Sequence, residues 1–250
     1  MHKQNNLLIL QARTSSTRLP GKVLAPINGT PMILIQLSRL LRSRKIDNII
    51  VATSRDVSDD KLFEILQKNH IKVFRGSLDN VYERFLEASN LFNCEVIIRI
   101  TGDCPLVMPE IIDELVEKFK ELGVDYLSNT LQPTFPDGLD VEIFSKKALL
   151  RLREFELTLD EVEHVTLGIY QRPDVFNIAS HENSTDLSNK RWTVDYPEDL
   201  AFVRGVFEHF LGREADFGLS DLNELLSMHP ELENTKSSSF RNIALKPEAP

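Results

Sequence analysis

Short apolar runs alternate with amphipathic segments along the first half of this chain, and this alternation constrains its fold more than any other feature. Apolar runs bounded by polar or turn-forming residues predict buried strands at residues 7–10, 48–53, 72–74 and 95–100. Between these runs, apolar residues recur at helical spacing, as they do at 32–41 and 111–119. The alternation therefore predicts an α/β fold with a mostly parallel sheet and helices on both faces.

Capping residues and prolines predict where the helices begin. Thr30 before Pro31 predicts the first helix, and Ser58 predicts the cap of the second. The second half of the chain is less regular. There we expect strands at 140–144, 175–180 and 191–194. The remaining helix starts are predicted at Asp79 or Asn80, Pro109, Ser145 and Pro197.

Composition excludes several classes of protein. The chain has 29 basic and 38 acidic residues and a net charge of -9, which disfavours non-specific binding to nucleic acid. Two cysteines, Cys94 and Cys104, provide no disulfide framework and favour a reducing compartment. No apolar run approaches the roughly 18 residues that a membrane helix needs, and no signal-peptide core is present. We therefore expect a cytoplasmic protein that does not bind a membrane.

The segment after the first predicted strand concentrates positive charge. Residues 11–22 read Gln-Ala-Arg-Thr-Ser-Ser-Thr-Arg-Leu-Pro-Gly-Lys, with three cations, four hydroxyls and no acidic residue. Ligands of open α/β sheets bind beyond the carboxyl ends of the strands, and Arg and Lys side chains match phosphate oxygens. The segment therefore predicts a phosphate-binding loop, although an exposed basic loop is the alternative. It is neither a P-loop nor a dinucleotide-binding glycine motif.

This loop, followed by Ile-Asn-Gly-Thr-Pro-Met at residues 27–32, resembles the start of the cytidylyltransferases that make CMP-activated sugar acids. It is similar to the acylneuraminate and 3-deoxy-manno-octulosonate synthetases, and most of all to the SpsF group of spore-coat polysaccharide biosynthesis. The resemblance covers roughly residues 5–210. It implies a Rossmann-like nucleotidyltransferase of the GT-A type that uses CTP. The nucleotide-binding residues that it implies in this loop are Gln11, Ala12, Arg13, Arg18 and Lys22, with Arg13 and Lys22 also catalytic.

We expect residues 1–230 to form a single nucleotidyltransferase domain. Its nucleotide-binding half would span about 1–129 and its acceptor-binding elements about 130–215. The polar residues 231–250 predict a flexible tail. Family analogy alone suggests a homodimer.

Two aspartates at predicted strand ends are candidate ligands of Mg²⁺. Asp103 lies in Thr-Gly-Asp-Cys-Pro-Leu, and Asp195 lies in Trp-Thr-Val-Asp-Tyr-Pro-Glu-Asp-Leu. Nucleotidyl transfer needs a divalent cation on the phosphates, and Mg²⁺ prefers one or two carboxylates together with phosphates and water. An aspartate at such a position is also a common turn former or helix cap. Both positions match the metal-binding aspartates of the family, and Asp103 is therefore also expected to be catalytic and to contact the nucleotide.

Three further segments are candidates for choosing the nucleotide and the acceptor. Arg75, Gly76 and Ser77 follow the third predicted strand and resemble an SpsF pattern near the base, although a plain connection to a helix would contain similar residues. A cluster of acids and one histidine could bind the acceptor; the alternatives are an Asp-Gly turn, a solvated strand face and an ordinary helix histidine. The candidate acceptor-binding residues are Asp137, Asp140, Glu142 and His164.

Together these features predict a metal-dependent cytidylyltransferase. It would transfer CMP from CTP to a sugar or sugar-acid acceptor, release pyrophosphate and serve surface polysaccharide biosynthesis. One alternative is a GT-A glycosyltransferase that uses a nucleotide-sugar donor, but the Asp-x-Asp motif of that class is missing at Asp103. Another is a binding protein without catalysis, which the intact loop and both aspartates disfavour.

Overall fold

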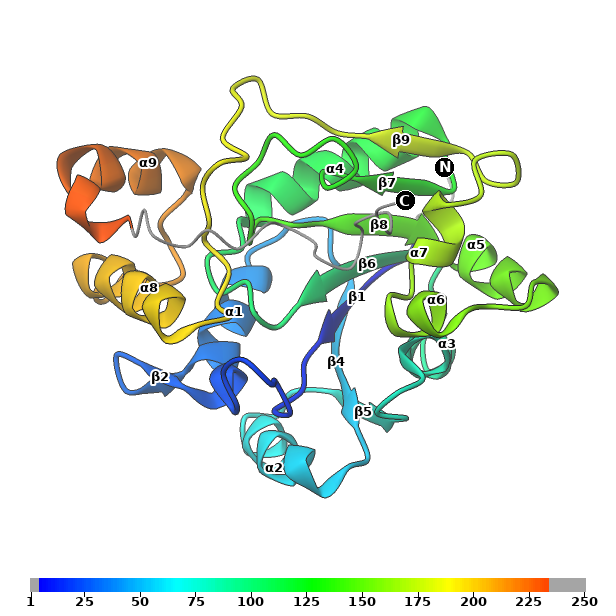
Figure 1. The fold of residues 1–250 in the computed structure, drawn as a ribbon, viewed down its shortest axis with the longest axis horizontal. Helices are drawn as coiled ribbons and strands as arrows, with labels where there is room; N and C mark the ends of the chain where they lie inside the picture. Colours follow the sequence, from blue (N-terminus) through cyan, green and yellow to red (C-terminus); the bar gives the residue numbers. More distant parts are fainter. Residues whose placement is uncertain (1–4, 234–250) are drawn as a thin grey trace, which may run out of the picture.

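The computed structural model describes residues 5–233, and among them a seven-stranded sheet forms the centre of the molecule (Figure 1). Its strand order is β5-β4-β1-β6-β8-β7-β9. β2 and β3 pair with each other in a separate two-stranded sheet. The strands are β1 (Asn6–Gln11), β2 (Pro26–Ile27), β3 (Thr30–Pro31), β4 (Asn48–Ser54), β5 (Val73–Gly76), β6 (Val96–Thr101), β7 (Tyr126–Ser128), β8 (Glu142–Ser145) and β9 (Ile178–Ser180).

The sheet is mostly parallel, as predicted. β1 pairs in parallel with β4 and with β6, and β4 pairs in parallel with β5. β8 runs antiparallel to both β6 and β7, while β7 and β9 are parallel. The carboxyl ends of β1, β4, β5 and β6 therefore meet at one edge of the sheet, where the loop of residues 11–22 begins.

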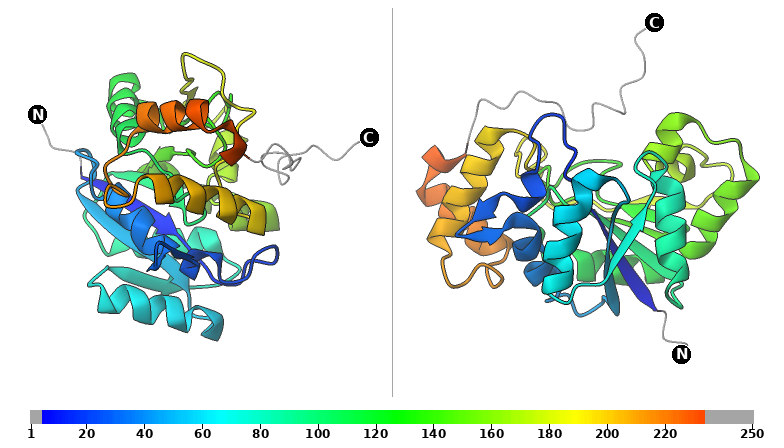
Figure 2. Two further views of the ribbon diagram at one scale, coloured as in Figure 1. Left: turned by 90° about the vertical axis from the view of Figure 1, so that its left-hand side faces the viewer. Right: turned by 90° about the horizontal axis from the view of Figure 1, so that it is seen from below.

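Helices cover both faces of the sheet (Figures 1 and 2). One face carries α1 (Met32–Leu40), α2 (Asp60–Lys68), α4 (Pro109–Leu122), α8 (Pro197–His209) and α9 (Leu219–Met228). The other carries α3 (Val81–Asn90), α5 (Lys146–Arg151), α6 (Leu159–Glu163) and α7 (Leu167–Tyr170). Short 3₁₀ turns are η1 (Lys22–Leu24), η2 (Val57–Asp59), η3 (Leu152–Glu154) and η4 (Pro230–Leu232).

The central strand β1 contributes side chains to two hydrophobic cores, because successive side chains of a strand point to opposite faces of the sheet. Leu8 and Leu10 pack into the core beneath α1 and α4, whereas Leu7 and Ile9 pack into the core beneath α3 and α5. All four side chains are at most 1% exposed. Burial of this kind contributes roughly 1.5–3 kcal/mol per side chain, so β1 is fixed from both sides.

Two predicted helix starts are wrong. Thr30 does not cap α1, because residues Thr30–Pro31 form β3 and pair with β2, so the helix begins only at Met32. Ser58 does not cap α2, because it lies inside η2 and its N–H donates to Asp56 at 2.9 Å. In both places the residue that resembled a helix cap belongs to a short preceding element, the strand β3 or the 3₁₀ turn η2.

The second half differs more from the predictions. Residues 191–194 form no strand; Arg191 makes only an isolated bridge with Asp137. β7, α6, α7 and α9 were not predicted. The helix starts at Asn80, Pro109, Ser145 and Pro197 are confirmed. From residue 234 on, the predicted tail lies outside the described residues. Among residues 5–233, no helix combines the length and apolar composition that a membrane span requires.

Candidate functional site

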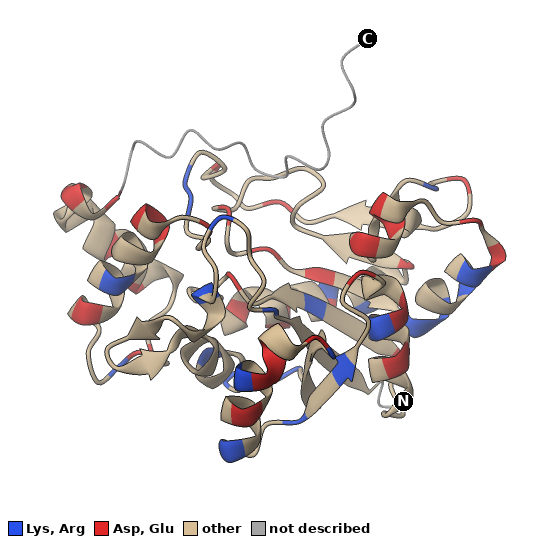
Figure 3. Cartoon of the chain, turned by 60° about the horizontal axis from the view of Figure 1, so that its bottom comes forward, with Lys and Arg blue, Asp and Glu red and all other residues tan. Residues whose placement is uncertain are grey.

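A cleft of about 800 Å³ opens at the carboxyl ends of β1 and β6. Its walls come from the loop of residues 11–22, the connection after β6, the start of β8, the α6–α7 segment and residues 191–195. The loops that meet over the sheet carry both signs of charge (Figure 3). The predicted site residues in its lining are Gln11, Ala12, Arg13, Arg18, Lys22, Asp103, Asp137, Asp140, Glu142, His164 and Asp195.

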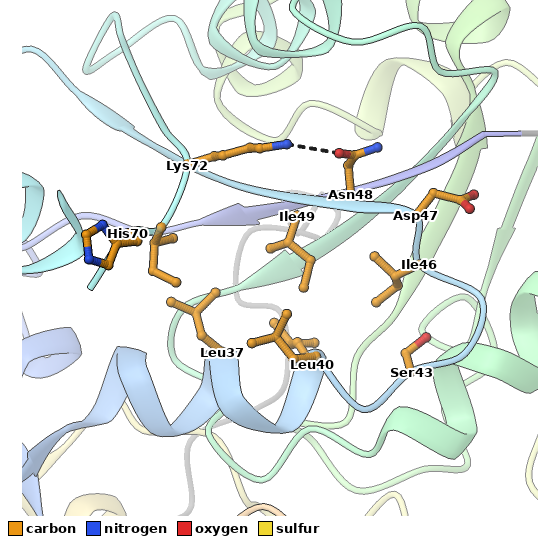
Figure 4. A pocket seen from close by; sticks show the side chains of 11 residues that line it. Leu37, Leu40, Ser43, Ile46, Asp47, Asn48, Ile49, His70 and Lys72 are labelled. Carbon is orange, nitrogen blue, oxygen red and sulfur yellow. Dashed lines mark hydrogen bonds between the residues drawn. The ribbon is translucent and has the colours of Figure 1, made fainter. Parts of the chain in front are cut away.

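A second, smaller cavity of about 270 Å³ lies where α1 ends and β4 begins (Figure 4). Leu37, Leu40 and Ile49 form much of its apolar wall, and Lys72 reaches across to Asn48 at 3.0 Å. This position is at the amino end of β4, away from the edge where ligands of α/β sheets bind. The larger cleft is therefore the candidate site.

The phosphate loop is held in shape by hydrogen bonds at both ends. Gly21 adopts the left-handed conformation with φ 72°, and its N–H donates to the Thr14 carbonyl at 2.8 Å. Asp59 accepts from the Thr14 N–H at 2.7 Å and from the Thr14 hydroxyl at 2.8 Å. The same carboxylate accepts from the Ser54 N–H at 3.1 Å. Asp59, fully buried, thus fixes the loop to the end of β4.

Lys22 lies between the two aspartates predicted to bind metal. Its Nζ donates to Asp103 Oδ2 at 2.9 Å, to Asp195 Oδ1 at 2.8 Å and to the Val194 carbonyl at 2.8 Å. Burial lowers the pKa of Lys22, but the two carboxylates outweigh burial and the pKa is raised. For Asp103, burial raises the pKa, but the Lys22 ammonium and hydrogen bonds outweigh it and leave the pKa at about 2. Both groups are therefore charged at neutral pH.

Asp195 is also approached by two arginines. Arg18 Nη2 lies 2.7 Å from Asp195 Oδ1, and Arg191 Nη2 lies 2.9 Å from Asp195 Oδ2. The backbone N–H of Asp195 donates to Asp199 at 2.8 Å, so Asp199 holds the segment that carries Asp195. Arg191 also pairs with Asp137 at 2.7 Å. The carboxylates of this part of the cleft are thus balanced by cations.

The carboxylate oxygens that meet at Lys22 fit the ligand preference of a magnesium ion. Asp103 and Asp195 bring hard carboxylate oxygens to one point, and Mg²⁺ prefers such ligands completed by phosphate oxygens and water. Residues 5–233 contain no group of three or more His, Cys, Asp or Glu side chains arranged to hold a metal. The protein would therefore supply two carboxylates, and the remaining ligands would come from a bound triphosphate and solvent.

Glu142 lies opposite Arg99 in the antiparallel pair of β8 and β6 and forms an ion pair with it. Glu142 Oε1 also accepts from the Tyr126 hydroxyl at 2.7 Å and from the Thr166 hydroxyl at 2.5 Å. Three protein donors therefore occupy this carboxylate. Glu142 lines the cleft, but its oxygens already accept hydrogen bonds from Arg99, Tyr126 and Thr166.

The other predicted acceptor residues also lie at the cleft. Asp137 precedes Gly138, whose φ is 106° and where a Cβ would come within 2.5 Å of the Thr193 nitrogen. The glycine is therefore required for a close approach of two chain segments as well as for a turn. His164 follows α6 directly, and together with Asp137 and Asp140 it lines the cleft. Their contact with an acceptor stays a prediction.

Arg75, Gly76 and Ser77 do not line the cleft. The Arg75 guanidinium donates to the Ser54 carbonyl at 2.8 Å and lies 2.7 Å from Asp60. Ser77 accepts from the Asn80 N–H at 3.0 Å, at the start of α3. These contacts tie β5 to its neighbours, and the nucleotide-binding role of the three residues stays a prediction.

Several residues of the cleft were not singled out from the sequence. Arg99 received no role, although a lone arginine in the apolar run Val-Ile-Ile-Arg-Ile is a signal of a buried charge that needs a partner. Tyr170 and Arg191 also line the cleft. Asp59, outside the cleft lining, fixes the loop of residues 11–22 through its hydrogen bonds with Thr14. No local pattern in the sequence indicates the pairs Arg99–Glu142, Thr14–Asp59 and Asp137–Arg191, whose members lie 43, 45 and 54 positions apart.

Known proteins resemble this chain over most of its length. Residues 7–217 match the sequence profile of a family described as cytidylyltransferase. The spore coat polysaccharide biosynthesis protein SpsF of Bacillus subtilis is 33% identical over 232 residues, which cover 90% of this chain and 95% of SpsF. The 3-deoxy-manno-octulosonate cytidylyltransferase of Geobacter sulfurreducens is 34% identical over 119 residues, covering 47% of this chain and 46% of that protein. The solved structure of a cytidylyltransferase from Leptospira borgpetersenii superposes with a TM-score of 0.86 at 32% identity, covering 96% of this chain and 100% of that one.

Proposed function

The chain belongs to the cytidylyltransferase family, as a nucleotidyltransferase of the CMP-sugar synthetase and SpsF type, and on that premise we propose that it transfers CMP from CTP to a sugar or sugar-acid acceptor. Pyrophosphate is the second product. The observation that carries this proposal is the meeting of Lys22 with Asp103 and Asp195 beside the phosphate loop. One ammonium and two carboxylates at that point match the charges of a triphosphate with its metal.

The phosphate loop binds the triphosphate. Arg13 and Arg18 are 42% and 43% exposed at their side chains, so both can turn toward a ligand in the cleft. Lys22 is fixed and supplies a point charge at the base of the loop. Their summed positive charge stabilises the negative charge that develops on the leaving pyrophosphate. Gln11 and Ala12 line the same wall at the end of β1.

Asp103 and Asp195 would hold Mg²⁺, which would neutralise phosphate charge and lower the pKa of the attacking hydroxyl. Arg191 and Asp199 keep Asp195 in place, and Lys22 keeps the two carboxylates together. The acceptor hydroxyl attacks the α-phosphorus in line, with positioning supplied by the cleft walls. No covalent intermediate with the protein is needed.

The acceptor occupies the side of the cleft formed by β8, the α6–α7 segment and the loop around Asp137. Residues 1–230 act as one domain, with nucleotide contacts from about 1–129 and acceptor contacts from about 130–215. A role in surface polysaccharide biosynthesis follows by analogy with SpsF, a spore coat polysaccharide biosynthesis protein. The glycosyltransferase alternative has no comparable support, because the matching family and the similar structure from Leptospira borgpetersenii are cytidylyltransferases and the Asp-x-Asp motif is missing at Asp103.

The proposal is tested by measuring pyrophosphate release with CTP, Mg²⁺ and a panel of sugars and sugar acids. The panel includes 3-deoxy-manno-octulosonate, its 8-amino-8-deoxy analogue and an acylneuraminate, each tried also with ATP, GTP and UTP. We expect release with CTP and at least one acceptor, and a loss of about 100-fold or more in Asp103→Asn. Asp56→Asn, an exposed cap outside the cleft lining, is the matched control. No release with any pair would overturn the proposal.

A further inference from the structure

Arg99 is a cation that lines the cleft. Some of its N–H groups donate to protein side chains, and the others remain for a ligand in the cleft. Its side chain is only 12% exposed, yet it belongs to the cleft lining. Nε donates to Gln11 Oε1 at 3.1 Å, and Nη1 donates to Glu142. Nη2 has no hydrogen-bond partner within residues 5–233. The guanidinium is therefore fixed on two sides and keeps donors for a ligand.

The partners of Arg99 are themselves fixed. Glu142 is occupied by the Tyr126 and Thr166 hydroxyls as well as by Arg99, so it has little capacity left for an acceptor hydroxyl. A carboxylate held in this way orients the guanidinium plane before any ligand arrives. Donors that are already oriented stabilise a bound anion without the cost of rearrangement.

Arg99 also lies on the acceptor side of the cleft. β6 lies between β1, which leads into the phosphate loop, and β8, which carries Glu142. Tyr170 of α7 lines the cleft next to this network, with its ring centroid 5.7 Å from that of Tyr126. Two acids of this side are already paired, Asp137 with Arg191 and Glu163 with Arg13. The side therefore offers an oriented cation to an acceptor.

We infer that Arg99 binds the acidic group of the acceptor, with Gln11 and Glu142 as positioning residues and Tyr170 as a second donor. A carboxylate is the group that best matches a fixed guanidinium donor. The acceptor is then a sugar acid, and a neutral sugar leaves Nη2 without a partner. This inference rests on the proposed function, since it assigns one part of that site.

The experiment compares a sugar acid that supports pyrophosphate release with the same compound carrying a carboxamide in place of the carboxylate. The variants are the double change Arg99→Met/Glu142→Gln, which avoids leaving a buried unpaired carboxylate, together with Arg99→Lys and Tyr170→Phe. Arg153→Met removes an Arg–Glu pair outside the cleft lining and is the matched control. KM for CTP and the thermal unfolding midpoint report whether each variant is folded and binds nucleotide.

We expect the wild type to prefer the acid, and the double variant to lose that preference through a rise of about 10–100-fold in the acceptor KM. KM for CTP should stay within about twofold. An unchanged ratio of acid to amide in a folded variant, or equal use of both by the wild type, would overturn the inference alone. Absence of pyrophosphate with every acceptor would overturn the proposed function and this inference with it. If the double variant does not fold, the same ratio in Arg99→Lys and Tyr170→Phe decides.

Discussion

Arg13 of the phosphate loop and Glu163 at the end of α6 face each other across the cleft, with Arg13 Nη2 3.7 Å from Glu163 Oε1. The two side chains are 42% and 53% exposed, so their attraction is worth at most about 1 kcal/mol. Arg13 is also the residue that we expect to bind phosphate. Glu163 therefore competes with the triphosphate for the same guanidinium.

Glu163→Gln should lower KM for CTP by about 2–5-fold, because the competing carboxylate is removed. The change should shrink at high salt, since exposed charges are screened. Steady-state pyrophosphate release at low and at high ionic strength measures both effects. Glu83→Gln, which breaks the pair with Arg153 outside the cleft, should leave KM for CTP unchanged. A higher KM in Glu163→Gln would mean that Glu163 assists nucleotide binding.

Asp59→Asn should destabilise the protein by about 2–3 kcal/mol and lower the activity further than the loss of stability explains. The amide cannot accept all the bonds that the buried carboxylate takes from Thr14 and Ser54, and an unmatched buried donor is costly. Urea unfolding and kcat at a temperature where the variant is folded separate the two effects. Asp56→Asn, in the same turn but exposed, should cost about 1 kcal/mol or less. Equal costs in the two variants would refute the anchoring role.

The contribution of Asp103 to stability should depend on pH in a defined window. Its folded pKa of about 2 lies below its ordinary value of 3.8, so its contribution is complete above about pH 4 and is lost as the pH falls toward 2. The shift corresponds to about 2 kcal/mol. Lys22 has a raised pKa, so its contribution is present below pH 10.5 and is lost only above that value.

Urea unfolding of the wild type and of Asp103→Asn at several pH values between 2 and 7 tests this expectation. The difference between their free energies of unfolding should be largest near neutral pH and should narrow below pH 4. A difference that stays constant down to pH 2 would show that Asp103 has an ordinary pKa in the folded protein.

The strands of the parallel half were predictable because their patterns are local. β1, β4 and β6 are short apolar runs, interrupted in β6 by Arg99, and such runs are typical of parallel strands that are buried on both faces. The strand predicted at residues 191–194 failed for the opposite reason. Trp192 and Val194 are buried, as strand residues would be, but Arg191 is held by side-chain ion pairs with Asp137 and Asp199. Asp137 lies 54 positions before Arg191, and a partner at that separation is invisible in a local pattern.

The same distinction applies to the candidate site. The loop stood out because it concentrates three cations without an acidic residue, and the two aspartates stood out because they match the metal-binding aspartates of the family that the chain resembles. The structure brings Lys22, Asp103 and Asp195 together. The structure also shows that Glu142 accepts a hydrogen bond from Arg99, a pairing that the spacing of residues in the sequence does not indicate. That pairing depends on the antiparallel register of β6 and β8, which joins residues 43 positions apart.

The position of Lys22 predicts a specific relation between this side chain and the metal. Its ammonium contacts the two carboxylates that we expect to hold Mg²⁺, so in the absence of nucleotide Lys22 and a divalent cation compete for the same oxygens. Lys22→Met removes the competitor and leaves two carboxylates facing each other, an arrangement that favours a cation. Binding of Mn²⁺ without nucleotide should therefore be tighter in this variant than in the wild type.

Activity should change in the opposite direction, because Lys22 also supplies charge to the phosphates. We expect a fall of about 100-fold or more in kcat/KM for Lys22→Met. Addition of EDTA to the wild type should stop pyrophosphate release, and Mg²⁺ should restore it. Mn²⁺ titration followed by electron paramagnetic resonance measures the affinity, with Lys190→Met, which breaks the pair with Glu233 outside the cleft lining, as the control. The same affinity in all three proteins would remove Asp103 and Asp195 as metal ligands, because loss of a cation that competes for their oxygens should strengthen binding there. Weaker Mn²⁺ binding in Lys22→Met would show instead that Lys22 is needed to hold the two carboxylates together.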